Sequence, residues 1–246
     1  MIKNYNFAII IPMANESKEF NLLIGKLQET LDSIESGQVY LIVDNASKDN
    51  TRELCDKLSI TDNRFTTIWA PENKNVVDAY IRGYKEAEPH HEIIIEMDAG
   101  MSHDPAAIPM FLRVLNEGNE CAFGSRFING GSIWQSSFKR SFLSKTGTIL
   151  SNLLLGTKMK DMTSGYQGFH ISVVRQLLKY RLLSTGHFYQ TEVRYLMRKL
   201  RYMEVPIHYR APSPSVSLGS IRNSLTVLFH YFLCRFKFKS KSISNE

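Results

Sequence analysis

The chain of 246 residues is 43% hydrophobic, which is enough for one sizeable core and a small appendage. Its charged fraction of 22% and its lack of low-complexity tracts exclude wholesale disorder, while a net charge of +6 leaves a basic excess. Three scattered cysteines form no metal-type pair, and the polar N-terminus leads directly into a strand, so we expect a cytoplasmic protein with reduced thiols and no secretory signal.

Strands and helices alternate through the first half of the chain. Short apolar runs rich in β-branched residues predict strands, and apolar residues that recur at helical spacing predict helices between them. The predicted strands cover residues 7–11, 39–43, 65–69, 92–97 and 121–123, and the predicted helices cover residues 20–34, 51–58, 76–87 and 105–115. Because helices separate successive strands, we expect βα units and a mainly parallel central sheet, which is an α/β fold.

The second half of the chain is less regular. Its periodicity predicts two more helices and one more strand, over residues 142–154, 192–201 and 203–208. The one linker-like stretch is Ala-Pro-Ser-Pro-Ser at residues 211–215. We therefore divide the chain into a domain of residues 1–211 and a segment of residues 212–246, which holds the linker and a C-terminal helix.

Residues 225–238 are almost entirely apolar and are followed by lysines. The few polar residues of this segment fall on one narrow stripe at helical spacing, which predicts a helix. At about 1.5 Å per residue this helix reaches about 21 Å, short of the roughly 30 Å hydrocarbon core of a bilayer. A wide apolar face followed by basic residues is typical of a helix in the interface of an anionic leaflet. Packing against the protein's own core or against a second subunit is the alternative.

Short polar motifs follow the predicted strands. They read Pro12-Met13-Ala14-Asn15-Glu16, Asp44-Asn45-Ala46-Ser47-Lys48-Asp49-Asn50-Thr51, Asp98-Ala99-Gly100, Gly124-Ser125-Arg126 and Asp161-Met162-Thr163-Ser164-Gly165. An open α/β sheet holds its ligand at the carboxyl ends of the strands. Asp98 ends a predicted central strand, where an uncompensated carboxylate is costly and a cation, or ribose and phosphate groups, would relieve that cost. Asp44 can accept hydrogen bonds from a nucleobase or a ribose, whereas Asp49 fits a helix cap at Thr51.

Together these motifs resemble those of the inverting family-2 glycosyltransferases of GT-A fold, and within them the dolichol- or polyprenyl-phosphate sugar synthases. The resemblance extends over about residues 7–210. The matching positions are Pro12, Asn15 and Glu16; Asp44, Ser47, Asp49 and Thr51; Ser102-His103-Asp104-Pro105; Gly124-Ser125-Arg126; Asp161, Ser164, Gly165 and Tyr166; Gln190-Thr191-Glu192; and Glu204-Val205-Pro206-Ile207. The resemblance implies a GT-A fold, with a mainly parallel sheet flanked by helices, and a hexosyltransferase activity.

The resemblance also implies a site for a nucleoside-diphosphate sugar, with GDP or UDP as the nucleotide. The residues that it assigns to the donor are Pro12, Asn15, Glu16, Asp44, Asp98, Arg126, Arg140 and Ser164. The N-terminal members of this set would hold the nucleobase and ribose, and Asp98 would reach the ribose or a metal ion. The two arginines would face the phosphates of donor or acceptor, since a guanidinium pairs with phosphate oxygens in two bonds and keeps its charge. The alternative for Arg126 is a surface ion pair.

The motif at Asp98 departs from the family pattern. Where the family has Asp-x-Asp, this chain has Asp98-Ala99-Gly100, so the second carboxylate, the usual metal ligand, is missing. A divalent ion on a nucleotide diphosphate takes one or two carboxylates plus phosphate oxygens, so Asp98 alone could hold Mg²⁺ or Mn²⁺, and we expect metal dependence. Glu96 should share the sheet face of Asp98, opposite Met97. Without an ion, arginines and lysines would stabilise the leaving diphosphate.

The implied reaction is a single inverting displacement at the anomeric carbon of the sugar, with Asp98 and Arg126 assigned to catalysis. A polyprenyl phosphate acceptor needs no base, because its oxygen is already ionised near neutral pH. A hydroxyl acceptor needs a carboxylate to take its proton, and Glu192 and Asp161 are the candidates. The apolar and basic C-terminus favours the lipid phosphate and a peripheral position on the cytoplasmic face of a membrane.

Two other functions stay open on the sequence. One is a glycosyltransferase of the same fold that acts on a hydroxyl of a surface polysaccharide or glycolipid. The other is a sugar-nucleotide-binding protein that has lost catalysis with the missing aspartate. A dinucleotide-dependent oxidoreductase is not expected, because no Gly-x-Gly-x-x-Gly follows the first strand. Nucleic-acid binding is not expected either, because basic and aromatic residues interleave only in the short tail.

Overall fold

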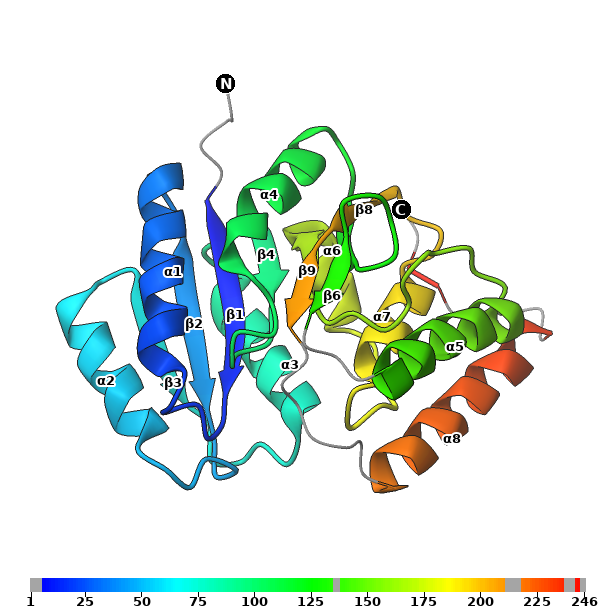
Figure 1. The fold of residues 1–246 in the computed structure, drawn as a ribbon, viewed down its shortest axis with the longest axis horizontal. Coiled ribbons are helices and arrows are strands. Elements are labelled where there is room, and N and C mark those ends of the chain that lie inside the picture. The colour runs from blue at the N-terminus through cyan, green and yellow to red at the C-terminus, as the bar shows by residue number, and fades with distance from the viewer. Residues whose placement is uncertain (1–5, 135–137, 211–217, 237–241, 244–246) are drawn as a thin grey trace.

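The computed structural model describes residues 6–134, 138–210, 218–236 and 242–243, with the backbone alone at residues 138–141, 143 and 218. These residues form a seven-stranded sheet in the order β3-β2-β1-β4-β7-β5-β8 and a smaller sheet of β6 and β9 (Figure 1). The strands are β1 (Phe7–Met13), β2 (Gln38–Val43), β3 (Phe65–Trp69), β4 (Ile93–Glu96), β5 (Cys121–Ser125), β6 (Ser132–Trp134), β7 (Gln167–His170), β8 (Tyr202–Pro206) and β9 (His208–Arg210). In the large sheet only β7 runs antiparallel to its neighbours, so the predicted mainly parallel α/β sheet is confirmed.

Helices cover both faces of the large sheet. They are α1 (Phe20–Ile34), α2 (Thr51–Thr61), α3 (Val76–Ala87), the 3₁₀ turn η1 (Pro105–Ala107), α4 (Ile108–Asn116), α5 (Phe138–Leu155), α6 (Ile171–Leu177), α7 (Tyr189–Leu196) and α8 (Leu218–Arg235). Side chains alternate along β1, so that Ile9 and Ile11 pack with α1, α2 and α4, whereas Ala8 and Ile10 pack with α3, α6 and α7. Burial on both faces explains why β1, β2 and β4 are almost continuously apolar.

The predicted elements of the first half agree best with the structure. The bounds of β3 and α3 match the prediction residue for residue, and Asn75 caps α3 by accepting hydrogen bonds from the first turn. The helix predicted over residues 192–201 is wrong in its bounds, because α7 starts and ends earlier. The strand predicted over residues 203–208 is divided between β8 and β9. The strands β6 and β7 and the helix α6 had no prediction.

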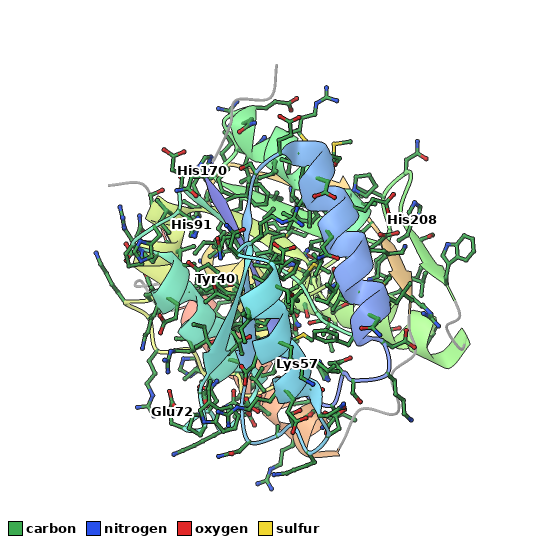
Figure 2. The ribbon with its side chains drawn as sticks, turned by 90° about the vertical axis from the view of Figure 1, so that its left-hand side faces the viewer. Tyr40, Lys57, Glu72, His91, His170 and His208 are labelled. Atoms are coloured by element: carbon green, nitrogen blue, oxygen red, sulfur yellow. The ribbon has the colours of Figure 1, made fainter. Side chains whose placement is uncertain are left out.

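Two polar aromatic side chains, those of Tyr40 and His91, pack together at the amino-terminal end of β4. Figure 2 shows Tyr40 and His91 close together, with Tyr40 Oη 3.1 Å from His91 Nε2. The other ring nitrogen, Nδ1, is 2.6 Å from Oδ1 of Asn6. Burial lowers the pKa of His91 to about 4, so its ring is neutral at pH 7. This histidine therefore has a structural role at the end of the strand away from the motifs.

Helix α8 lies beside α5 and has two different faces (Figure 1). One face is buried in the main core through Val227, Leu228 and Tyr231, so for this face the alternative of packing on the protein's own core holds. The opposite face is exposed, as described below. The lysines at residues 237–241 and the predicted linker at residues 211–215 lie outside the described residues, so the division at residue 211 stays a prediction. Across the described ranges, every helix is too short or too polar to cross a membrane.

Candidate active site

The loops after β1 and β2 are locked to each other at the carboxyl edge of the sheet. Asn15 has a left-handed backbone with a φ of 60°, which asparagine tolerates better than most residues. Its N–H donates to Ser47 Oγ at 3.1 Å, its side-chain amide donates to the carbonyl of Ala46 at 3.1 Å, and its Oδ1 accepts from the N–H of Lys48 at 2.8 Å. The side chain of Asn15 therefore shapes the two loops from within.

Asp44 follows β2 at the same edge, close to Pro12 of β1, which is in register with Ile42. The strand β1 runs through Pro12 to Met13, beyond the predicted end at residue 11. Asp44 is buried, and its Oδ1 accepts a hydrogen bond from the N–H of Ala46 at 2.8 Å. Its Oδ2 accepts none from the described part of the chain, which leaves this oxygen for a hydroxyl or N–H of a ligand.

Asp49 has the structural role predicted for it at the start of α2. Its Oδ2 accepts from the N–H of Ser17 at 3.2 Å, and its Oδ1 accepts from the N–H and hydroxyl of Thr51 at 3.1 and 2.6 Å. These hydrogen bonds lower the pKa of Asp49. The hydroxyl of Thr51 in turn accepts from the N–H of Glu16 at 2.8 Å. Asp49 thus helps to place the backbone of Glu16 at the edge of the sheet.

Asp98 lies at the carboxyl end of β4, the middle strand of the sheet, and its side chain is 37% exposed. The fully buried Tyr80 of α3 donates its hydroxyl to Asp98 Oδ1 at 2.8 Å. The backbone N–H of Asp98 donates to Nδ1 of His103 at 2.9 Å, which leaves the proton of the neutral ring on Nε2. Burial lowers the pKa of His103, which keeps the ring neutral. Asp98 is therefore an oriented carboxylate that a ligand can reach.

Glu96 lies beneath Asp98 on the same face of the strand, as predicted, while Met97 packs into the opposite core. The donors of hydrogen bonds to its fully buried carboxylate are Tyr84, Tyr189 and Gln167. Burial raises the pKa of Glu96 to about 7, although these hydrogen bonds oppose the shift. Tyr189 also stacks on Tyr80 with ring centroids 5.5 Å apart. A buried polar network thus supports Asp98 from below.

Gly100 stands where the family motif has its second aspartate, and the carboxylate of Glu16 lies against it. The backbone of Gly100 is left-handed, and a Cβ atom built there would lie 3.0 Å from Glu16 Oε2. Burial, and then the charges of Asp49 and Asp98, raise the pKa of Glu16 to about 7. Glu16 and Asp98 are therefore close enough to repel each other, and two carboxylates share this part of the edge.

The residues at this edge fit a divalent ion that arrives with a nucleotide rather than a preformed metal centre. Within the described ranges, no three or more His, Cys, Asp or Glu side chains group together in a way that could hold a metal. An ion on a nucleotide diphosphate takes only one or two protein carboxylates, and phosphate oxygens and water supply the rest. The accessible carboxylate of Asp98 provides one such ligand, with Glu16 beside it.

Arg126 ends the Gly-Ser-Arg motif and is paired with Asp161. Its Nε and Nη2 donate to the two carboxylate oxygens at 2.7 and 2.8 Å, and Nη2 also donates to Thr163 Oγ1 at 2.5 Å. Asp161 is fully buried and Arg126 is 7% exposed, so this ion pair is internal rather than on the surface. Burial opposes the ionisation of Asp161, but the hydrogen bonds and charge of Arg126 outweigh it and lower the pKa of Asp161 to about 2. Arg126 also faces the ring of Tyr209, which contacts the ring of His103.

Arg194 was not a candidate from the sequence, yet it is fully buried where the later motifs meet. Its guanidinium donates to the backbone carbonyls of Asp161, Gly124 and Ser164. Burial lowers the pKa of Arg194 to about 10, with the charge of Asp161 opposing the shift, so the side chain stays charged at pH 7. An arginine on a helix is ordinarily solvated, so the sequence carried no signal for this role.

The predicted base Glu192 is buried and already bound by protein donors. Its carboxylate accepts from the N–H groups of Leu183 and Ser184, both at 2.8 Å, and from the hydroxyl of Tyr231 at 2.7 Å. These donors belong to the loop before α7 and to α8, so Glu192 anchors α8 to the rest of the domain. Arg140 belongs to α5, but its side chain lies outside the described residues.

Gly165 lies close against both Asp98 and Gln190. A Cβ atom built on Gly165 would lie 2.9 Å from Gln190 Nε2 and 3.3 Å from Asp98 Oδ1. In the sequence Gln190 is only one position of a matching motif, and its place beside Asp98 depends on the packing of α7. The structure therefore brings Glu16, Asp98 and Gln190 to one edge, whereas Asp161 and its partner belong to the framework behind it.

Comparison with known sequences identifies relatives of this chain. Residues 8–178 match the sequence model of glycosyl transferase family 2. Polyprenol monophosphomannose synthase of Mycolicibacterium smegmatis is 28% identical over 225 residues, which cover 90% of this chain and 83% of the relative. Undecaprenyl-phosphate mannosyltransferase of Micrococcus luteus is 28% identical over 81% of this chain and 82% of its own length. Dolichol-phosphate mannosyltransferase of Pyrococcus furiosus is 30% identical over 66% of this chain and 44% of its own length.

Solved structures with the same fold carry nucleotides and metal ions. A mannosyltransferase from Pyrobaculum calidifontis in complex with GDP-Man and Mn²⁺ has a TM-score of 0.65 at 13% identity, covering 97% of this chain and 66% of that one. Glucosyl-3-phosphoglycerate synthase from Mycobacterium tuberculosis, in complex with Mn²⁺, UDP-Glc and phosphoglyceric acid, has a TM-score of 0.63 at 14% identity, covering 98% and 82%. These likenesses confirm the predicted GT-A fold. The protein is a glycosyltransferase, and its chain belongs to glycosyl transferase family 2.

Proposed function

We propose that this enzyme transfers a sugar from a nucleoside diphosphate to a polyprenyl phosphate, with inversion at the anomeric carbon. The three relatives are named polyprenol monophosphomannose synthase, undecaprenyl-phosphate mannosyltransferase and dolichol-phosphate mannosyltransferase. These names support a polyprenyl phosphate as the acceptor. The observation that carries the proposal is the state of the two candidate bases. Asp161 is paired with Arg126, and Glu192 is bound by three protein donors, so neither is free to take a proton. An acceptor phosphate needs no base.

The proposed step is a single displacement. An oxygen of the acceptor phosphate attacks the anomeric carbon, and the bond from that carbon to the nucleoside diphosphate breaks. The electron pair of the broken bond leaves with the diphosphate. The enzyme's contribution is to align the two reactants and to neutralise the charge that develops on the leaving group.

Different residues at the sheet edge are assigned to different parts of the donor. Asp44 and Glu16 would hold the nucleobase and ribose through their open carboxylate oxygens. Asp98, oriented by Tyr80, would face the ribose or a bound Mg²⁺ or Mn²⁺. The ion, when bound, supplies positive charge against the leaving diphosphate. The remaining phosphate contacts are assigned to Arg140 and to Nη1 of Arg126, since its ion pair uses the other guanidinium nitrogens.

The test of this function is transfer of a radiolabelled sugar. Purified enzyme is incubated with GDP-mannose or another sugar nucleotide, Mg²⁺ or Mn²⁺, and polyprenyl phosphate. We expect a product that is extracted into organic solvent and hydrolysed by mild acid. Label in an acid-stable glycolipid or in polysaccharide would instead favour a hydroxyl acceptor. Binding of sugar nucleotide without transfer to any acceptor would favour a binding protein without catalysis.

Helices α5 and α8 present exposed apolar side chains on what we call the two-helix face. These residues are Phe142, Ile149, Leu150 and Leu153 of α5, Ile221, Leu225, Phe229 and Leu233 of α8, and Phe236 directly after α8. Arg235 of α8 donates from Nη1 to the carbonyls of Leu153 and Leu154, which ties the two helices together. We propose that the two-helix face lies in the interface of the membrane that holds the lipid acceptor, on its cytoplasmic side.

The double substitution Phe229→Ser and Leu233→Ser is expected to lower binding to anionic vesicles by at least about tenfold. Each of these apolar side chains contributes about 1.5–3 kcal/mol when it leaves water completely. Both are about half exposed or more, at 60% and 46%, so their removal leaves the core intact. Co-sedimentation with vesicles of phosphatidylglycerol and phosphatidylcholine measures the binding.

The matched control is Ile60→Ser, because Ile60 is 85% exposed on α2, at the other end of the molecule. This control should bind vesicles like the unaltered protein. Full retention of the double variant on vesicles would mean that another surface makes the contact. Deleting the whole helix is a weaker test, since Val227, Leu228 and Tyr231 belong to the core and the deletion would disturb the fold.

A further inference from the structure

Gln190 in the first turn of α7 is a buried side chain with an unused hydrogen-bonding group. It is 6% exposed, and its Oε1 is enclosed without a hydrogen-bond partner in the described part of the chain. Buried side-chain oxygens are nearly always paired in folded proteins, and leaving one unpaired costs free energy. A ligand that supplies the missing donor would explain why an amide is present here.

The surroundings of Gln190 place its side-chain amide beside Asp98, in the active site. The position that a Cβ atom of Gly165 would occupy is 2.9 Å from Gln190 Nε2, and it is 3.3 and 3.4 Å from the two carboxylate oxygens of Asp98. The backbone of Gly165 is not left-handed, so its conformation alone does not demand glycine. Glycine lets the backbone approach both groups closely, so the Asp98 carboxylate and the Gln190 amide border the same space.

The order of the strands indicates which part of the donor reaches this space. From β2 through β1 and β4 to β7, the edge carries Asp44, then Glu16, then Asp98, and then Gly165 beside Gln190. A sugar nucleotide is linear, with base, ribose, diphosphate and sugar in that order. If the nucleoside lies at Asp44 and Glu16, the sugar lies beyond Asp98, next to Gln190.

We propose that Gln190 hydrogen-bonds a hydroxyl of the transferred sugar and thereby helps to select that sugar, an inference that rests on the proposed function. The chemistry of the space favours a hydroxyl over a phosphate. The Asp98 carboxylate and the unpaired Oε1 of Gln190 are both acceptors, and acceptors pair with hydroxyl groups but repel an anionic phosphate. The amide can also donate through Nε2, so it suits a group that both donates and accepts.

The experiment compares sugar nucleotides with the free nucleotides that lack the sugar. Gln190→Met keeps the length of the side chain and removes its hydrogen bonds. Isothermal titration calorimetry with GDP-mannose or UDP-glucose should show an affinity lowered by about tenfold, the effect of one lost hydrogen bond. The affinity for GDP or UDP should be unchanged. Gln38→Met is the control, since this glutamine bonds Thr66 at the opposite end of β2, and it should alter neither affinity.

A second variant keeps the test decisive if Gln190→Met folds poorly. Gly165→Ala adds one methyl group that would lie 2.9 Å from Gln190 Nε2, in a backbone conformation that alanine tolerates. The Gln190 amide must shift to make room, so this variant should weaken sugar-nucleotide binding selectively in the same way. Equal losses for GDP and GDP-mannose, or no loss for either, would overturn the inference. Failure of the unaltered enzyme to glycosylate polyprenyl phosphate would overturn the proposed acceptor instead, because these binding measurements use no acceptor.

Discussion

Replacing Asp98 by asparagine is expected to lower kcat by about 100- to 1000-fold while leaving the melting temperature almost unchanged. Loss of one preorganised electrostatic contact to a transition state has effects of about this size. The fold should tolerate the change, because asparagine Oδ1 can still accept from Tyr80 and the backbone N–H still donates to His103. What asparagine lacks is the negative charge that a cation or the ribose hydroxyls would use.

Steady-state transfer assays and thermal melting of the same preparations provide the measurement. Asp56→Asn is the matched control, because Asp56 is half exposed and pairs with Arg52 on the surface of α2. It should be neutral in both assays. Tyr80→Phe should lower kcat by a smaller factor, since it leaves the carboxylate in place and removes its orienting hydrogen bond. Full activity of Asp98→Asn would remove Asp98 from the reaction.

The first half of the fold could be predicted because its signals are local. Strands β1, β2 and β4 are buried on both faces, read as apolar runs, and end in polar turns. The strand β7 gives no such signal, since Gln167-Gly168-Phe169-His170 contains one large apolar side chain. It becomes a strand because β4 and β5 pair with it from both sides. A Cβ atom on Gly168 would come within 3.2 Å of Phe111, so the helix α4 packs directly on this strand.

The residues of the candidate site likewise fall into two groups, those that local sequence patterns place and those that depend on partners distant in the sequence. Carboxylates that end parallel strands, such as Asp44 and Asp98, could be predicted to share an edge from the α/β pattern alone. The partner of Arg126 could not, because Asp161 is 35 positions away and in an irregular segment. The hydrogen bonds of Glu192 could not be predicted either, since Tyr231 lies 39 positions further on in α8. Two residues proposed for catalysis from motifs therefore have their carboxylates committed to holding the structure together.

Replacing Asp161 by asparagine is expected to lower the free energy of unfolding by about 3–5 kcal/mol, a large share of the 5–15 kcal/mol typical of a domain. The change leaves the buried guanidinium of Arg126 without its counter-charge. A second positive guanidinium, that of Arg194, lies close by, since it donates to the backbone carbonyl of Asp161. It also weakens the hydrogen bonds that Asp161 accepts from Arg126 and Thr163. Urea denaturation followed by circular dichroism measures the loss, which should bring down activity with it.

The pH dependence of this loss separates an ion pair from simple packing. The folded-state pKa of Asp161 is lowered from 3.8 to about 2, so its contribution is complete above about pH 4 and disappears as the pH falls towards 2. The difference in unfolding free energy between the unaltered protein and Asp161→Asn should therefore shrink by about 2 kcal/mol over that range. Glu117→Gln, which breaks the exposed pair with Arg113, should cost under about 1 kcal/mol. If Asp161→Asn lowered the free energy of unfolding as little as Glu117→Gln does, the structural role of Asp161 would be contradicted. A buried guanidinium without its partner should destabilise the fold by much more.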